Sequence, residues 1–296
     1  MLLWFICSWP GARSTTIRAG AAFFVYHCTQ CRCHTCRKSR NGDWRFNGHG
    51  HRQGCVFKTK GPFMHVLKAI FLSAALVSGA PAWAGDTKVV VELFTSQGCS
   101  SCPPADALME RLAKKDHVIA LALHVDYWDY IGWKDIFADP AYTARQKAYA
   151  HVAGRNMVYT PQMIVNGTDQ VVGARAMELA DLIVAHAGVA PRAQVMAKRD
   201  GDMLRVGVLP LGDGLDGKYL LQLVRYSDQH TVDITSGENA GRTISYFHVV
   251  DGWETIGDWD GRTPKTVEVQ IVGDRPAVVL VQQDGPGPIV AAAEID

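Results

Sequence analysis

The stretch VVVELFTSQGCSSCPP, residues 89–104, joins an apolar run to two cysteines and two prolines. The first part of this stretch is almost entirely apolar or β-branched, as is typical of a strand that is buried on both faces. The two closing prolines suit the first turn of a helix, because a proline there loses no hydrogen bond. Cys99 and Cys102 are therefore expected where a buried strand gives way to a helix.

The segments that follow predict an α/β unit. Apolar side chains recur at helical spacing directly after the prolines, and residues 118–125 form a second apolar run. A strand, a helix and a second strand in this order imply parallel pairing through a right-handed crossover. Farther along, Asp139 is placed to cap a helix, and Asn166-Gly167 suits a tight hairpin turn.

The pattern changes near residue 191. From there to the C-terminus, short alternating runs of apolar and polar residues are separated by turns rich in glycine and aspartate. Such runs are typical of an antiparallel β-sandwich or barrel-like domain. We therefore expect the fold class to be α/β, with an α/β domain at residues 85–190 and a β-rich, sandwich-like domain at residues 191–296.

Residues 64–84 have the layout of a secretory signal peptide. A short leader with Lys68 precedes an apolar run, and Ala82 and Ala84 form an A-x-A site before Gly85. The apolar run is shorter than the ~20 residues that cross a bilayer, so no stable membrane anchor is expected. We expect the mature protein to be periplasmic or secreted.

Residues 1–63 show no sustained period of a strand or a helix. Because a signal peptide works at an N-terminus, we expect translation to begin at Met64 and residues 1–63 to be mistranslated upstream sequence or disordered. Six of the eight cysteines lie in this stretch. The spacing of those between Cys28 and Cys36 offers an alternative, because thiolates at such intervals can close a zinc site.

The charge of the mature chain argues against nucleic-acid partners. From residue 85 onward the chain carries 19 basic and 28 acidic residues, although the whole sequence has a net charge of +1. A chain this acidic repels phosphate backbones. No nucleic acid is therefore expected as a partner.

Cys99 and Cys102 form a C-x-x-C pair at the predicted helix start. Unpaired N–H groups and the helix dipole favour a thiolate there, so Cys99 is expected to act as the nucleophile. Cys102 is then placed to resolve a mixed disulfide. The pattern alone also serves zinc sites and structural disulfides.

The order of strand, C-x-x-C, helix and strand, followed by Tyr159-Thr160-Pro161, resembles the thioredoxin superfamily. This resemblance implies that the α/β domain is thioredoxin-like and that a cis Pro161 packs beside the sulfurs. More narrowly, the motifs at residues 92–106, 124–129 and 159–163 resemble DUF1223, a family of secreted bacterial proteins of unknown function. The DUF1223 resemblance extends from residue 88 to the C-terminus and implies no substrate.

Three further side chains are candidates for the site. Glu92 interrupts the first strand, where thioredoxin-like proteins often hold a buried acid that relays protons to the second thiol. A strand-end glutamate in water is the alternative. Tyr127 and Trp128 lie in an aromatic loop that offers a surface for substrate, although core packing explains such residues more often.

The predicted function is that of an exported thiol–disulfide oxidoreductase or redox partner, acting on a protein or small-molecule thiol or disulfide. Thr160 and Pro161 would shape the substrate groove, and no cofactor is expected. Two alternatives stay open. In the first, the thiolates and His124, with Asp126 or Met163, hold copper or zinc. In the second, the protein is a ligand-binding module with a structural disulfide. The oligomeric state is not indicated.

Overall fold

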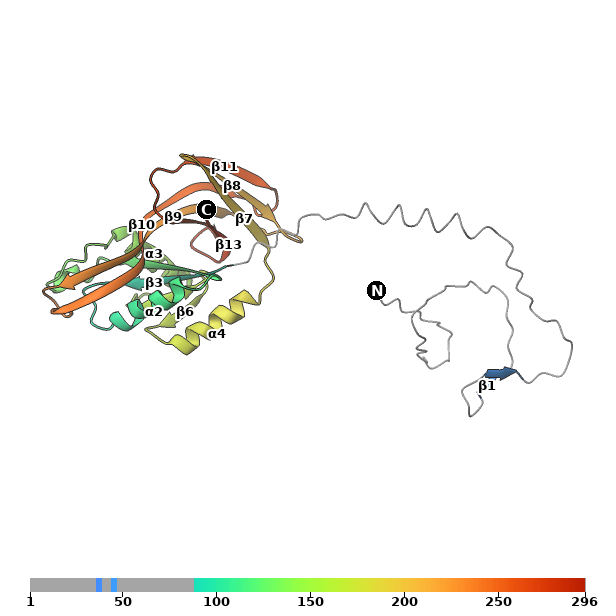
Figure 1. The fold of residues 1–296 in the computed structure, drawn as a ribbon, viewed down its shortest axis with the longest axis horizontal. Helices are drawn as coiled ribbons and strands as arrows, with labels where there is room; N and C mark the ends of the chain where they lie inside the picture. The colour runs from blue at the N-terminus through green and yellow to red at the C-terminus, as the bar shows by residue number, and fades with distance from the viewer. Residues whose placement is uncertain (1–35, 39–43, 47–87, 296) are drawn as a thin grey trace. The chain divides into compact units, whose positions relative to one another are not determined.

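The computed structural model describes residues 36–38, 44–46 and 88–295. Strands β1 (Cys36–Lys38) and β2 (Trp44–Phe46) pair antiparallel (Figure 1). These two strands belong to a unit within residues 1–78, and residues 79–296 contain a second compact unit. The predicted signal peptide at 64–84 lies outside the described residues, as do the cysteines of the zinc alternative that precede Cys36.

The second unit is built mainly from strands, with helices between the first few of them. Its strands are β3 (Val89–Thr95), β4 (Val118–His124), β5 (Gln162–Val165), β6 (Asp169–Val172), β7 (Ala193–Asp200), β8 (Met203–Pro210), β9 (Tyr219–Ile234), β10 (Arg242–Trp259), β11 (Lys265–Gln270), β12 (Ala277–Gln283) and β13 (Ile289–Glu294). Its described helices are α2 (Pro103–Ala113), the 3-10 turn η2 (Asp129–Ile131), α3 (Pro140–Val152) and α4 (Ala176–Ala187).

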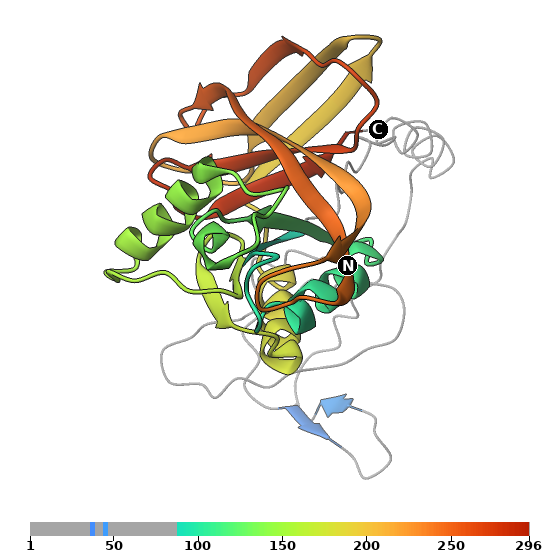
Figure 2. The ribbon, with the colours of Figure 1, turned by 90° about the vertical axis from the view of Figure 1, so that its left-hand side faces the viewer.

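Eight of these strands form one mixed sheet in the order β13-β12-β9-β10-β4-β3-β5-β6. Parallel pairing joins β3 to β4 and β4 to β10, and the other neighbours run antiparallel. A second sheet has the order β11-β8-β7 and can be followed in Figure 2. Its apolar side chains pack against those of β9 and β12.

The expectation of a thioredoxin-like α/β domain followed by a separate β-rich domain is wrong. Within residues 88–295, strands account for 44% and helices for 19%, so this part of the chain is mostly β-sheet. The physical reason lies at β4, because another strand pairs with it on the side away from β3. There Val249 of β10 pairs in parallel with Ala122 of β4. The strands before and after residue 191 therefore share one sheet.

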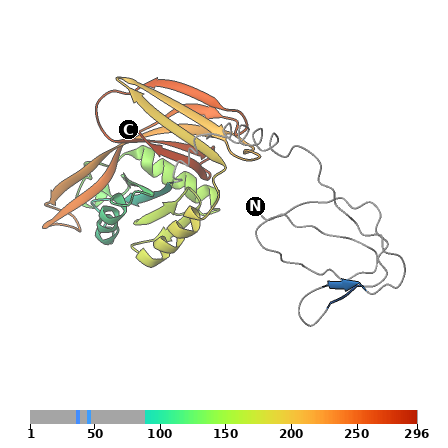
Figure 3. The same cartoon turned by 45° about the vertical axis from the view of Figure 1, so that its right-hand side comes forward.

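The apolar core is shared in the same way. On the face of the sheet that α3 covers, one buried cluster includes Val90, Phe94, Leu121, Val224, Val250 and Leu280. These side chains come from both predicted domains. The opposite face of β3 and β4 is covered by α2 and α4, and Figure 3 shows α3 and α4 on opposite sides of these strands.

The local predictions around the cysteines are confirmed. Strand β3 is buried along its whole length, and α2 begins with its two prolines at the first helical positions. The Asp139 side chain caps α3 by accepting the N–H of Ala141 at 2.8 Å. Asn166 and Gly167 form the β5–β6 turn with φ values of 44° and 72°, the left-handed region that such turns require.

Strands β9 and β10 have 16 and 18 residues and extend past the other strands of the sheet. On the N-terminal side of Val249, residues 242–247 of β10 pair with residues 229–234 of β9 as a two-stranded arm. This arm lies along α2 (Figure 1). The β-rich half therefore reaches the segment that carries the cysteines.

A chain that ends at residue 190 should fail to fold cooperatively. It would keep Val90, Phe94 and Leu121 but lose the side chains from β9, β10 and β12 that bury them, and each exposed side chain forfeits about 1.5–3 kcal/mol of burial. Circular dichroism should show a cooperative thermal transition for residues 88–295 and none for residues 88–190. A cooperative transition in the shorter chain would contradict the shared core.

Candidate functional site

The disulfide between Cys99 and Cys102 lies in the turn between β3 and α2. The two Cα atoms are 5.4 Å apart, and Cys102 is the N-cap residue of α2. The exposed fraction is 2% for Cys99 and 0% for Cys102, whereas Ser100 and Ser101 between them are exposed. The structure thus brings the two predicted cysteines together, and it buries them more deeply than an open helix mouth would.

The turn is held by its own backbone hydrogen bonds. The Cys102 N–H donates to the Cys99 carbonyl at 3.2 Å, and the Cys99 N–H donates to the Ser96 carbonyl at 3.2 Å. The Cys102 carbonyl in turn accepts the first N–H groups of the helix. The sulfur atoms therefore lie at the helix N-terminus, where the helix dipole favours negative charge.

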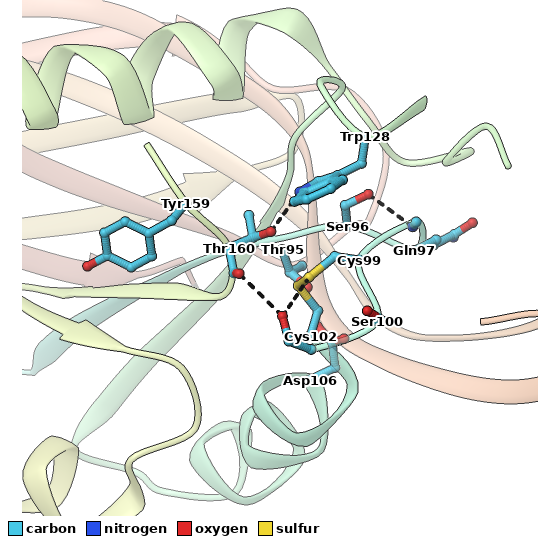
Figure 4. Close-up of a disulfide and its surroundings, with 12 residues drawn as sticks. Thr95, Ser96, Gln97, Cys99, Ser100, Cys102, Asp106, Trp128, Tyr159 and Thr160 are labelled. Carbon is cyan, nitrogen blue, oxygen red and sulfur yellow. Dashed lines mark hydrogen bonds between the residues drawn. A yellow bond between two sulfur atoms is a disulfide. The ribbon is translucent and has the colours of Figure 1, made fainter. Parts of the chain in front are cut away.

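The loop at residues 159–161 lies beside the disulfide. The Thr160–Pro161 peptide bond is cis, as the family resemblance implies. Ser101 Oγ donates to the Thr160 carbonyl at 3.5 Å, and the Trp128 indole donates to Thr160 Oγ1 at 2.7 Å. Figure 4 shows Trp128 and Thr160 next to the Cys99–Cys102 bond. Thr160, Pro161 and Trp128 are therefore at the site.

Tyr127 lies next to Trp128, with ring centroids 5.9 Å apart. Its hydroxyl donates to Gln146 Oε1 on α3 at 3.2 Å. Burial raises the pKa of Tyr127 to about 12. The Tyr127 hydroxyl thus binds α3, and the Tyr127 ring packs against Trp128.

Glu92 is not near the cysteines. Alternation along β3 sends its side chain to the α3 face, whereas the cysteines precede α2 on the opposite face. There the carboxylate accepts two hydrogen bonds from Arg145, at 2.6 and 3.1 Å, and one from Tyr149 at 2.5 Å. Glu92 is fully buried, so it is neither a strand end in water nor in contact with a thiol.

Asp106 is the buried acid on the cysteine side, and the sequence interpretation missed it. It lies one helical turn after Cys102, and its N–H donates to the Cys102 carbonyl at 3.1 Å. Its Oδ1 accepts the Thr95 hydroxyl at 2.7 Å, and its Oδ2 has no hydrogen-bond partner among the described residues. Burial raises the pKa of Asp106 to about 7. The available signal was an acid at i+4 from Cys102, on the apolar face of the helix.

A second buried pair supports the loop before the disulfide. His124 Nδ1 lies 2.7 Å from Asp135 Oδ2, and the same oxygen accepts the Gln97 N–H at 2.8 Å. Burial alone would raise the pKa of Asp135, but His124 holds it below its ordinary value. His124 is thus engaged with Asp135 through Nδ1. In the described part of the chain, no group of three or more His, Cys, Asp or Glu side chains is arranged to hold a metal ion.

The fold and the site define a protein with a mixed sheet and a C-x-x-C disulfide at a helix N-terminus, beside a cis-proline. The chain belongs to the DUF1223 family, since the model described as "Protein of unknown function (DUF1223)" matches residues 90–282. No curated protein matches the sequence. Among residues 36–38, 44–46 and 88–295, no helix has the length and apolar character of a membrane span.

Two solved structures are similar to this one. One is the crystal structure of protein AGR_C_4864 from Agrobacterium tumefaciens, whose sequence is 38% identical to this one. Its TM-score is 0.61, and the match covers 70% of this chain and 93% of that chain. HBP35 of Porphyromonas gingivalis is 14% identical, with a TM-score of 0.51 over 71% of this chain and 74% of that chain. The second likeness shows the fold alone.

Replacing Asp106 should change how stability depends on pH. Because the pKa of Asp106 is raised from 3.8 to about 7, the folded protein holds that proton to higher pH than the unfolded chain does. This contribution to the free energy of unfolding is therefore lost as pH rises through about 7. The advantage of Asp106→Asn over the parent protein should grow between about pH 4 and pH 8, by on the order of 2–4 kcal/mol.

Urea unfolding of the oxidised proteins at several pH values measures this difference. Asp116→Asn, at an exposed position, is the matched control. An Asp106→Asn difference that does not change with pH would show that Asp106 titrates as an ordinary carboxyl group.

Proposed function

We propose that the protein exchanges disulfides with thiol or disulfide partners through Cys99 and Cys102. The observation that carries the proposal is the position of this pair, at the first turn of α2 and beside the cis Thr160–Pro161 bond. A thiolate at such a position is favoured by the helix N-terminus. Exchange at this pair depends on the local arrangement of the β3–α2 turn and the Thr160–Pro161 bond, and it requires no separate thioredoxin-like domain.

In the reduced protein, the Cys99 thiolate attacks one sulfur of a partner disulfide. A bond forms between Cys99 and that sulfur, and the partner's other sulfur leaves as a thiolate. Cys102 then attacks the Cys99 sulfur, which re-forms the Cys99–Cys102 disulfide and releases the partner's second thiolate. The partner is reduced by two electrons and the protein is oxidised by two, and the reverse sequence oxidises a partner dithiol.

Asp106 is the residue that we assign to proton transfer at Cys102. Cys102 must lose its proton before it attacks, and a buried carboxylate one turn away on the same helix can accept it. A pKa of about 7 suits this role, since a base works best when its pKa lies near the working pH. Glu92 is removed from this role because Arg145 and Tyr149 hold it on the other face.

Trp128 and Thr160 are the surface that we assign to the partner. They lie beside the disulfide, and the Trp128 indole fixes the Thr160 side chain. We further propose that exchange takes place outside the cytosol. The signal-peptide pattern at residues 64–84 supports this location, since disulfides persist in oxidising compartments.

The low exposure of Cys99 favours a second candidate function. With 2% of Cys99 exposed, the disulfide could serve only to hold the β3–α2 turn in a ligand-binding protein. A structural disulfide would exchange slowly and would leave no reactive thiol. The two candidates therefore differ in whether a partner can be trapped.

A mixed-disulfide trap separates them. The Cys102→Ser variant should accumulate covalent complexes with partners, because the attacking Cys99 stays and the resolving thiol is lost. The Cys99→Ser variant should accumulate few or none, and the double variant is the control for non-specific capture. The complexes can be isolated from the organism's extracytoplasmic fraction and identified by mass spectrometry. Equal trapping by both single variants, or none by either, would favour the structural disulfide.

A further inference from the structure

The tip of the β9–β10 hairpin, residues 235–241, is docked onto the disulfide turn. Asn239 donates through Nδ2 to the Gln97 carbonyl at 2.8 Å and to the Cys99 carbonyl at 3.0 Å. The exposed fraction of Asn239 is 1%, so these bonds are shielded from water. The hairpin tip therefore binds the backbone of Cys99, the proposed nucleophile.

Further contacts fix the hairpin tip to the aromatic loop. Ser236 Oγ donates to the Gly132 carbonyl at 2.6 Å. Gly237 has φ +75°, and a Cβ built on it would lie 3.0 Å from the Trp133 Cβ. The Trp133 indole in turn donates to Gln97 Oε1 at 2.7 Å. A side chain at position 237 would therefore be strained and would require Trp133 to shift.

The docked tip places a carboxylate at the turn. Glu238 Oε2 accepts the N–H of Ser100, the residue after Cys99, at 3.3 Å. Glu238 is exposed, so its charge is accessible from solvent. The Glu238 carboxylate therefore lies beside the residue that follows Cys99.

We propose that Glu238, held in place by Asn239, makes the disulfide site select partners with positive charge beside the reacting sulfur. The proposal rests on the exchange function proposed above. Glu238 is a specificity-determining residue and Asn239 is a positioning residue. The β-rich half of the chain would then contribute to partner choice at the cysteines.

Two small thiols of opposite charge test this preference. Cysteamine carries an ammonium group and 2-mercaptoethanesulfonate carries a sulfonate, while 2-mercaptoethanol is the neutral reference. In each case the probe thiolate attacks Cys99, Cys102 leaves as a thiolate, and a second probe thiolate releases the probe disulfide. The readout is the ratio of the cysteamine rate to the mercaptoethanesulfonate rate, each expressed per thiolate. Intrinsic differences between the probes cancel when this ratio is compared between proteins.

Glu238→Gln should lower this ratio by about ninefold, because the lost charge slows the cationic probe and speeds the anionic probe by about threefold each, the scale of one unit-charge interaction near a protein surface. Added salt at about 1 M should lower the ratio of the parent protein in the same direction, because the Debye length falls to about 3 Å. Glu254→Gln is the matched control, since Glu254 is exposed on the same hairpin and pairs with Arg225. Its ratio should equal that of the parent. Arg242, which follows the tip, is unchanged in all variants.

Asn239→Ala tests the positioning role. It should lower the ratio toward that of Glu238→Gln, and the double variant should show little further change, because both lesions act on one charge. A merely structural Asn239 would lower the melting temperature and leave the ratio unchanged. Equal ratios in the parent and Glu238→Gln, with normal reduction by 2-mercaptoethanol, would overturn the selectivity. Failure of every thiol to reduce the disulfide in any variant would instead overturn the exchange function itself.

Discussion

The parallel pairing of β10 with β4 is the interaction on which the rest of the structure depends. It joins the strands before residue 191 to those after it in one sheet, at Val249 and Ala122. Next to this junction, His248 has φ 50° and its ring Nδ1 lies 3.0 Å from the Ala120 carbonyl, so the strand changes direction where it meets β4. Because β10 is anchored there, its outer part and β9 extend along α2 and deliver Asn239 to the disulfide turn.

The same sheet places two buried acids, Glu92 and Asp106, on opposite faces and in different surroundings. Side chains of β3 alternate between faces, so Glu92 points to α3 and is neutralised by Arg145, which also stacks 3.9 Å from the Trp253 ring centroid. A buried ion pair of this kind resists the loss of either partner. Asp106 lies on the other face, where Thr95 is its hydrogen-bond donor and no cation pairs directly with it among the described residues. It is therefore Asp106 whose proton affinity is raised by burial.

The local structure could be predicted from the sequence, and the long-range pairing could not. The apolar run before Cys99, the prolines after Cys102, the Asp139 cap and the Asn166-Gly167 turn each act over a few residues, and all are confirmed. Periodicity shows that a strand is buried, but it does not show which strand lies beside it. The β4–β10 pairing therefore cannot be read from the sequence, and the change of pattern near residue 191 predicts a separate domain. For a related reason the sequence does not show that Glu92 lies away from the cysteines, because the face to which Glu92 points depends on which helices cover the sheet.

The reduction potential of the Cys99–Cys102 pair tests the central claim most directly. It can be measured on the full chain by equilibration in dithiothreitol or glutathione redox buffers, followed by thiol alkylation and mass spectrometry. An exchanging pair should have a potential above about −300 mV and should equilibrate with both buffers. A potential below about −300 mV, with no equilibration in the glutathione buffer, would show that the disulfide is structural and would contradict the account.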